Sequence, residues 1–422
     1  MALLASVLLP LAALNFTAAF GIVGLPPSDL TTYKMILTQC AVCATELGLT
    51  LGKKCGRCST RYCGPECQVQ HWKEGGHDKL CKQIKRSGGA EQYNANIKYT
   101  EAVTVAAEAC ADDTKGQTCY ICMEAAHRHT GEGLVRGCAC GDRDGVASGR
   151  TGIAHVSCLA EQAKILVAEA EENNLDDRVL NERWHRWSSC SLCEQKYHGV
   201  VRCALGWACW KTHVGRPEGD RIRHHAMTQL GHGLSEVDHH EAALTVQEAE
   251  LSMRQRFGDA VSNILIAQGN LANSYQRLRR LDEALRMRQE VYSGSLRLNG
   301  EGHEQTLGAA FNYASTLCEI RRFEEARSLL RRTLPVARRV LGANNENTHR
   351  MRKVYAKALF MDDGATLDDL REAVTTLEDA VQIARRVFGS THPLTLDAGV
   401  TLRDAQEVLR AREDGMRVKF VD

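Results

Sequence analysis

The sequence predicts a mainly α-helical protein in which two small cross-braced metal-binding modules precede an α-solenoid of helix pairs. Two observations lead to this prediction. Of the 18 Cys residues, all but one lie between Cys40 and Cys209, in short pairs with interleaved His. Such spacing is typical of zinc ligands rather than of disulfides. After residue 222 Cys almost disappears, and Arg, Ala, Leu and Glu recur with a period of 42 residues, which indicates stacked helix pairs.

Length and composition exclude several classes of function. A chain of 422 residues predicts two to four domains, at roughly 150 residues each. The 53 Lys and Arg residues balance 52 Asp and Glu, so no strongly basic nucleic-acid-binding surface is expected and no nucleic-acid partner is predicted. We find no phosphate-binding loop, dinucleotide fingerprint, Ser/His/Asp triad or paired-carboxylate site, so the sequence predicts no catalytic side chain.

The N-terminal segment, residues 1–30, is apolar and carries no charge before Asp29. Three interpretations compete: a disordered or mis-assigned start, a cleaved presequence, and a membrane anchor formed by residues 1–25. We favour the first, because zinc thiolates require a reducing compartment. The protein is therefore expected in the cytoplasm or nucleus, with an anchor or presequence as the alternative.

The first Cys cluster supplies eight candidate ligands, enough for two tetrahedral zinc sites. A segment of this size buries too little apolar surface to fold alone, so metal must supply its stability. Because interleaved pairs close larger loops, we expect two groups of four. The first group is Cys40, Cys43, Cys63 and Cys67, and the second is Cys55, Cys58, His77 and Cys81.

The segment "CAVC…CGRCSTRYCGPECQVQHWKEGGHDKLC" resembles a MYND-type zinc finger along its whole length, residues 38–83. The resemblance implies a two-zinc module that binds short, often Pro-rich peptides and performs no catalysis. Trp72 lies between the last ligand pairs. It either packs its helix onto the zinc frame or contacts a bound peptide.

The second cluster, in residues 115–199, again supplies eight ligands, and its motifs resemble the RING-CH variant of RING fingers. These motifs are "CYICMEAA", "VRGCACGDRDG", "AHVSCLAEQAKI" and "RWSSCSLCEQKYHG". The resemblance implies a cross-brace with two groups of ligands. Cys119, Cys122, His155 and Cys158 would hold one zinc, and Cys138, Cys140, Cys190 and Cys193 the other. The sixteen ligands of both modules predict about four zinc ions per chain.

The RING-CH resemblance implies a ubiquitin ligase that docks a ubiquitin-conjugating enzyme, with Ile121 contacting that partner. Such a ligase acts by positioning rather than through a nucleophile of its own. Gln162 replaces the Trp that the family has after Cys158, with Trp187 as a candidate substitute. The sequence therefore predicts a zinc-binding adaptor that recruits clients through its MYND finger and repeats, with ligase activity left open. The alternative is a non-catalytic interaction scaffold with structural zinc fingers.

The C-terminal repeats, residues 222–412, pair "NLANSYQRLRRLDEALRMR" with "NYASTLCEIRRFEEARSLL" at a spacing of 42. An insertion of five residues around 362–366 shifts the third copy. The pattern resembles the tetratricopeptide repeats of kinesin light chains, which implies a superhelix whose groove binds peptides. Asn270 and Asn312 are candidate peptide contacts, although Asn also caps or bridges helices locally.

The connecting segments complete the expected organisation. Residues 84–114 are expected to be a linker with a short helix at 100–111, preceded by a hinge at 82–89. Residues 200–221 are expected to be a linker helix, and residues 413–422 a tail. A further helix is predicted over 159–172. Outside the ligand series, four Cys are predicted to be buried: Cys110, Cys203, Cys209 and Cys318. Six His are predicted to be solvated or to cap helices: His127, His129, His224, His225, His239 and His240.

Overall fold

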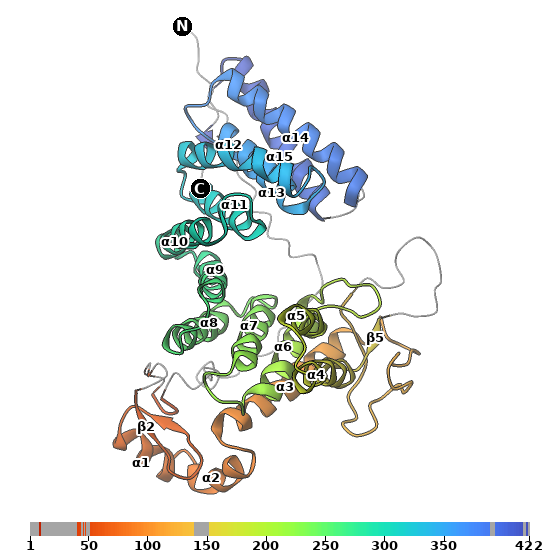
Figure 1. The fold of residues 1–422 in the computed structure, drawn as a ribbon, viewed down its shortest axis with the longest axis vertical. Helices are drawn as coiled ribbons and strands as arrows, with labels where there is room; N and C mark the ends of the chain where they lie inside the picture. Colours follow the sequence, from red (N-terminus) through yellow and green to blue (C-terminus); the bar gives the residue numbers. More distant parts are fainter. Residues whose placement is uncertain are drawn as a thin grey trace. The chain divides into compact units, whose positions relative to one another are not determined.

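The computed structural model describes residues 8–9, 40–43, 45, 47, 51–138, 152–388, 393–416 and 419–420. It confirms the predicted fold class, with small Cys-rich modules followed by a stack of helices (Figure 1). The chain forms two compact units, residues 29–267 and residues 268–422 together with 1–28. The apolar segment 1–30 lies outside the described residues except for strand β1 (Leu8–Leu9). Among the described helices, none is both long and apolar enough to cross a membrane.

The first finger consists of a short hairpin and two helices. Strands β2 (Lys53–Lys54) and β3 (Arg61–Tyr62) pair antiparallel. Helix α1 (Pro65–Lys73) begins with a proline, whose fixed φ suits the first helical position. Helix α2 (His77–Arg86) extends through most of the segment expected to be a hinge. It ends before Gly88 and Gly89, whose φ angles of 96° and 106° disfavour any residue with a side chain.

Helix α3 (Ala90–Ala109) is 20 residues long and begins ten residues before the helix expected at 100–111. Its buried residues explain the difference. Ala95, Tyr99, Val103 and Ala106 form one stripe at spacings of four, four and three, which is the pattern of an amphipathic helix. This stripe belongs to the main core of the first unit, so the segment is a structural helix rather than a flexible connection.

The second Cys module contains a hairpin of β4 (Val135–Arg136) and β5 (Ile153–Ala154), followed by α4 (Val156–Glu172) and α5 (Asp177–Trp184). A single 3-10 turn, His185–Trp187, follows. The helix predicted over 159–172 is confirmed and starts three residues earlier. The Glu132 carboxylate accepts hydrogen bonds from both the N–H and the hydroxyl of Ser157, each at 2.7 Å, and so caps the start of α4.

Three further helices lie wholly within the first unit: α6 (Gly199–His213), α7 (Arg221–Ser235) and α8 (His240–Arg256). The segment of α6 was expected to be a linker, but most of the helix is buried, because its apolar residues lie on every face. Gly206 and Gly233 allow α6 and α7 to approach closely. A Cβ at either position would lie 2.9 Å from a backbone oxygen of the other helix. The second Cys module and these helices therefore share one hydrophobic core.

The remaining helices belong to the repeats, and the boundary between the two units falls within α9 (Figure 1). They are α9 (Val261–Arg277), α10 (Leu281–Asn299), α11 (Glu304–Glu319), α12 (Phe323–Val340), α13 (Glu346–Phe360), α14 (Leu367–Phe388) and α15 (Pro393–Glu413). Strand β6 (Lys419–Phe420) pairs in parallel with β1. From α10 onward, successive helices pack against each other.

The period of 42 is visible in the backbone itself. Gly258, Gly300 and Gly342 follow successive second helices with φ angles of 67°, 79° and 89°. Arg279 and Arg321, also 42 apart, adopt φ angles of 60° and 62° in the turns within a pair. Ala residues at equivalent positions of the first helices are fully buried, where helices cross closely: Ala272, Ala314 and Ala356. The inserted residues form the loop between α13 and α14. The repeat prediction is confirmed.

Acidification is expected to destabilise the first unit through His213, which is 6% exposed and packs between the rings of Trp184 and Trp187. Burial lowers the pKa of His213 from its ordinary value of 6.5 to about 4. The neutral imidazole is therefore favoured by folding, and its stabilisation is complete above pH 6.5 and is lost as the pH falls toward 4. We expect a loss of about 2 kcal/mol between pH 7 and pH 5 from this residue.

Urea unfolding followed by Trp fluorescence measures this effect in the first unit, because all 5 Trp residues lie there. The variant His213→Phe should lose about 2 kcal/mol less than the wild type over the same pH interval. The matched control is His239→Phe, at an exposed position, which should keep the wild-type pH dependence. An identical pH dependence in wild type and His213→Phe would show that His213 does not carry the effect.

Candidate metal centres

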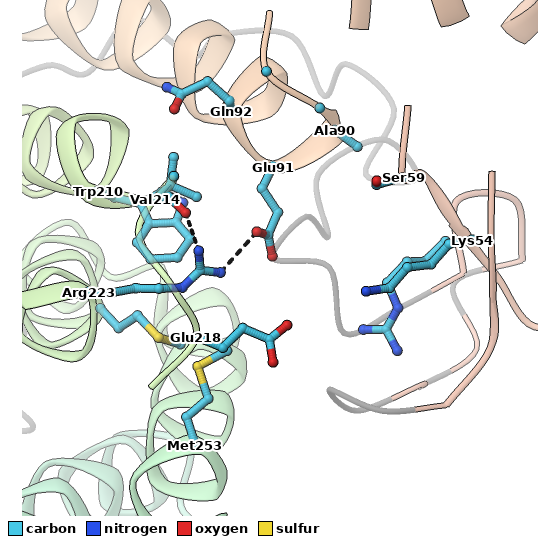
Figure 2. A pocket seen from close by; sticks show the side chains of 15 residues that line it. Lys54, Ser59, Ala90, Glu91, Gln92, Trp210, Val214, Glu218, Arg223 and Met253 are labelled. Carbon is cyan, nitrogen blue, oxygen red and sulfur yellow. Dashed lines mark hydrogen bonds and ion pairs between the residues drawn. The ribbon is translucent and has the colours of Figure 1, made fainter. Parts of the chain in front are cut away.

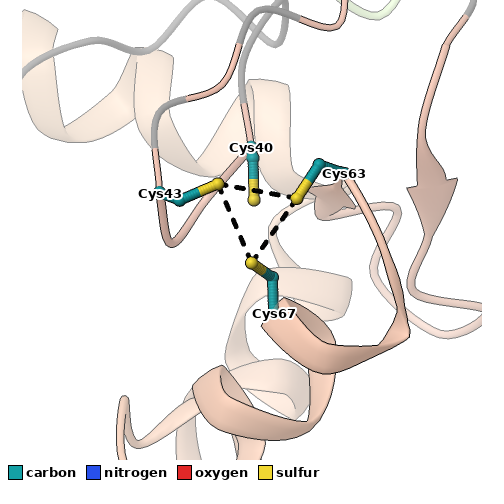
Figure 3. Close-up of side chains that lie close together, drawn as sticks. All are labelled: Cys40, Cys43, Cys63 and Cys67. Atoms are coloured by element: carbon teal, nitrogen blue, oxygen red, sulfur yellow. Dashed lines mark hydrogen bonds between the residues drawn. The ribbon is translucent and has the colours of Figure 1, made fainter.

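The structure brings Cys40, Cys43, Cys63 and Cys67 together, as Figure 3 shows. The first two lie in one turn, Cys63 directly follows β3, and Cys67 lies in α1. The sulfur of Cys63 is 3.5 Å from those of Cys43 and Cys67, and the latter two are 3.8 Å apart. A tetrahedral zinc with Zn–S bonds of about 2.3 Å separates its sulfur ligands by roughly 3.8 Å. The donor set therefore fits one zinc ion.

A second group contains Cys55, Cys58, His77 and Cys81, and all four side chains are buried. The Cys55 and Cys81 sulfurs are 3.8 Å apart, and His77 Nε2 lies 3.4 Å from the Cys58 sulfur. The other ring nitrogen, Nδ1, is buried without a hydrogen bond among the described residues. His77 therefore presents Nε2 to the site. The turn of the hairpin carries the Cys55–Cys58 pair, and Cys63 directly follows β3, so the two groups of ligands interleave along the chain.

The thiols of the first group compete for protons in the absence of a cation. A hydrogen bond from the Thr45 side chain lowers the pKa of Cys43 to about 6. By contrast, a hydrogen bond with the Cys63 thiol raises the pKa of Cys67. Four thiolates this close repel one another, and a divalent cation removes that repulsion, because the thiolate is the form that binds zinc. The arrangement thus favours bound metal over four free thiols.

The second module groups Cys119, Cys122, His155 and Cys158. His155 Nδ1 lies 3.4 Å from the Cys122 sulfur and 3.7 Å from the Cys158 sulfur. Its other ring nitrogen, Nε2, is buried on the side away from these two sulfurs. The two modules therefore use opposite imidazole nitrogens: His77 offers Nε2 and His155 offers Nδ1. The spacing of residues gave no signal for this difference.

The fourth group contains Cys138, Cys190 and Cys193. Cys140, the fourth ligand predicted for this zinc, lies outside the described residues. Gly137, which precedes Cys138, is required by close packing, because a Cβ there would lie 2.7 Å from the Val201 side chain. The loop that carries Cys138 therefore rests directly on helix α6.

The candidate partner-binding residues of the fingers lie at the surface. Trp72 on α1 is 44% exposed, and its ring also meets His77 edge-on at 5.8 Å. It therefore supports the zinc frame and presents apolar surface to solvent. Ile121 is half-buried in the turn between Cys119 and Cys122. The hydroxyl of the preceding Tyr120 lies 3.0 Å from that of Ser191, which joins this turn to the turn between Cys190 and Cys193.

Asn270 and Asn312 occupy equivalent positions on α9 and α11, and both are half-buried. The side-chain nitrogen of Asn270 is buried and has no hydrogen bond among the described residues. The backbone carbonyl of Asn312 accepts a hydrogen bond from the Thr316 hydroxyl.

Four further predictions concern Cys residues outside the ligand series, and all four are buried as expected: Cys110, Cys203, Cys209 and Cys318. The prediction of solvated or capping His was wrong for two residues. His224 is 2% exposed, and burial lowers the pKa of His225 to about 4. Trp187, the candidate substitute for the Trp that Gln162 replaces, is fully buried in the core.

Taken together, the clusters and the helical repeats define a zinc-finger protein with tetratricopeptide repeats, a class of protein-interaction scaffold. The MYND finger family matches residues 40–81, and this match implies zinc binding. Tetratricopeptide repeat families match residues 263–339 and 365–394. The second Cys module lies outside these three matches. Among curated proteins, none matches the chain.

Solved structures similar to this chain also contain helical repeats. A Podosopora anserina protein with "kinesin light chain nearly identical TPR-like repeats" is 16% identical, with a TM-score of 0.37, and the match covers 55% of this chain and 97% of that one. BtubC (BKLC) from P. vanneervenii is 13% identical, with a TM-score of 0.34, over 63% and 95% of the two chains. A Rap protein complexed with competence and sporulation factor is 14% identical, with a TM-score of 0.36, over 61% and 71%.

Proposed function

We propose that this protein is a zinc-dependent adaptor whose second Cys module is a RING-CH-type finger that docks a ubiquitin-conjugating enzyme. Its MYND finger and repeats would bind the client proteins. About four zinc ions would be bound per chain, two in each module. The reduced thiols that the ligands require favour a cytoplasmic or nuclear location.

One observation carries the ligase proposal: the two turns that hold the outer ligand pairs of the second module lie side by side. The hydrogen bond between Tyr120 and Ser191 links them. Each turn presents an apolar side chain between its two Cys ligands, namely Ile121 and the 38% exposed Leu192. Two adjacent zinc-held turns with apolar tips form a rigid docking surface, and rigidity reduces the entropy lost on binding.

The variant Ile121→Ala tests this proposal in an assay with ubiquitin, activating enzyme, conjugating enzymes and ATP. We expect the rate of chain formation to fall at least tenfold, because a half-buried aliphatic contact contributes about 1.5 kcal/mol or more. Zinc content should be unchanged. Leu175→Ala, at a 37% exposed position between α4 and α5, is the matched control and should retain full activity.

A non-catalytic scaffold is the alternative, and Gln162 together with the buried Trp187 favours it. RING-CH fingers have a Trp where this chain has Gln162, and the buried ring of Trp187 is not accessible to a partner. Absence of chain formation across a panel of conjugating enzymes, with zinc content intact, would establish the scaffold and eliminate the ligase.

In the repeats, the side-chain nitrogen of Asn270 is buried without a hydrogen bond among the described residues, which supports a role in binding a peptide backbone. A buried amide without a partner is costly, and a bound peptide carbonyl would satisfy it. A bound peptide would therefore lose affinity on Asn270→Ala substitution, whereas Arg277→Ala, at an exposed position on the same helix, is the control and should leave the affinity unchanged.

A further inference from the structure

A pocket of about 260 Å³ opens between the first finger and the helices of the first unit (Figure 2). The hairpin contributes Lys54 and Arg61, and α6 and α7 contribute Trp210 and Arg223. The lining therefore combines residues of the finger with residues more than a hundred positions later in the chain. No motif of the MYND finger contains this combination.

The charges around the pocket leave an excess of positive charge. Two carboxylates line it, and both are already paired: Glu91 with Arg223 at 2.9 Å, and Glu218 with Arg256. Lys54 is exposed, and within the described part of the chain it has no carboxylate partner. Arg61 also lines the pocket and donates a hydrogen bond to the Leu51 carbonyl. Glu91 and Glu218 also act electrostatically on Arg61. An anionic group entering the pocket would therefore first meet Lys54, without breaking a pair within the described residues.

Two buried apolar side chains line the pocket beside Arg223. Trp210 is 3% exposed and Met253 is 2% exposed. The Arg223 guanidinium lies 5.2 Å from the centre of the Trp210 ring, a cation–π contact that fixes its position. The volume is below the roughly 300–1,000 Å³ of pockets that hold drug-sized ligands. It therefore suits one or two amino-acid side chains, with methylenes against Trp210 and Met253 and a carboxylate at the basic rim.

We propose that this pocket binds an acidic segment of a partner protein, with a carboxylate side chain seated against Lys54 and Arg61. The site lies at the junction of the finger and the helices, so it is separate from the docking surface of the second module. The inference requires a finger folded around its metal but does not depend on ligase activity.

Fluorescence anisotropy with labelled hexaglutamate and the full-length, zinc-loaded protein tests the proposal. We expect saturable binding that weakens as salt is raised, because exposed charges are screened. Lys54→Glu should weaken binding at least tenfold. The matched control is Lys53→Glu, which carries the same charge change. Lys53 is equally exposed, but successive residues of a strand face opposite sides and Lys53 does not line the pocket. It should change affinity less than twofold.

Three results would overturn the proposal. The first is that labelled hexaglutamine binds with the same affinity as hexaglutamate. The second is that Lys53→Glu and Lys54→Glu weaken the binding of hexaglutamate equally. The third is that inorganic phosphate, at a concentration that supplies the same amount of negative charge, displaces hexaglutamate. The first would remove the requirement for carboxylates, the second would indicate a diffuse basic surface, and the third a general anion site. Zinc content and ubiquitin-chain formation are measured on the same variants. If both are normal while hexaglutamate binding fails, the pocket proposal fails and the proposed function does not.

Discussion

Removal of zinc by a chelator is expected to unfold the first finger, residues 40–86, while the repeats keep their structure. The finger has a very small hydrophobic core, and four of the eight buried hydrophobic residues in this core are candidate metal ligands: Cys40, Cys55, Cys58 and Cys81. A structural zinc contributes about 10–16 kcal/mol in finger peptides, which is as large as the stability of a whole domain. Little apolar packing remains to hold the finger once the metal leaves.

Hydrogen exchange with and without 1,10-phenanthroline measures this effect. Peptides from α1 and α2 should lose protection, whereas peptides from α12 and α13 should not, because no predicted ligand lies in the repeats. The second module should respond less than the first finger, since its ligands belong to the large core that includes α3, α4 and α6. Full protection of α1 and α2 in chelator would mean that the finger does not depend on metal.

The grouping of ligands was predictable because it follows from local spacing. Two Cys separated by two residues occupy one turn, and in the first finger interleaved pairs close larger loops than consecutive pairs do. The structure places Cys40 and Cys63 in one group and Cys55 and Cys81 in the other for that reason. The repeats were predictable on similar grounds, since a period of 42 fixes which residues stack.

The relation of the second module to the helices was not predictable from spacing. Helix α6 was expected to be a linker because it follows the last ligand pair and precedes the Gly-Arg-Pro break at 215–217. Its apolar residues on every face were the available signal for a buried helix. The choice of imidazole nitrogen and the basic pocket depend on residues far apart in the chain, and no local pattern contains them.

Arg202→Ala is expected to lower the free energy of unfolding of the first unit by about 3 kcal/mol, since two charge-assisted hydrogen bonds are lost. Arg202 is 6% exposed on α6. It donates to the Trp187 carbonyl at 2.9 Å and to the Gln229 side-chain oxygen at 2.5 Å. Burial lowers its pKa to about 10, so the guanidinium remains charged at pH 7. The residue thus fixes the segment before Cys190 to α6 and α7.

Urea unfolding followed by Trp fluorescence measures this loss, with a double-mutant cycle to isolate the contact. Arg202→Ala and Gln229→Ala should together cost at least 1 kcal/mol less than the sum of the single changes, because each removes the same hydrogen bond. Arg221→Ala, which breaks an exposed ion pair with Asp177, is the matched control and should cost less than about 1 kcal/mol. Additive costs for Arg202 and Gln229 would mean that the two side chains act separately. Faster zinc release from Arg202→Ala than from Arg221→Ala would link the helical core directly to the metal site at Cys190 and Cys193.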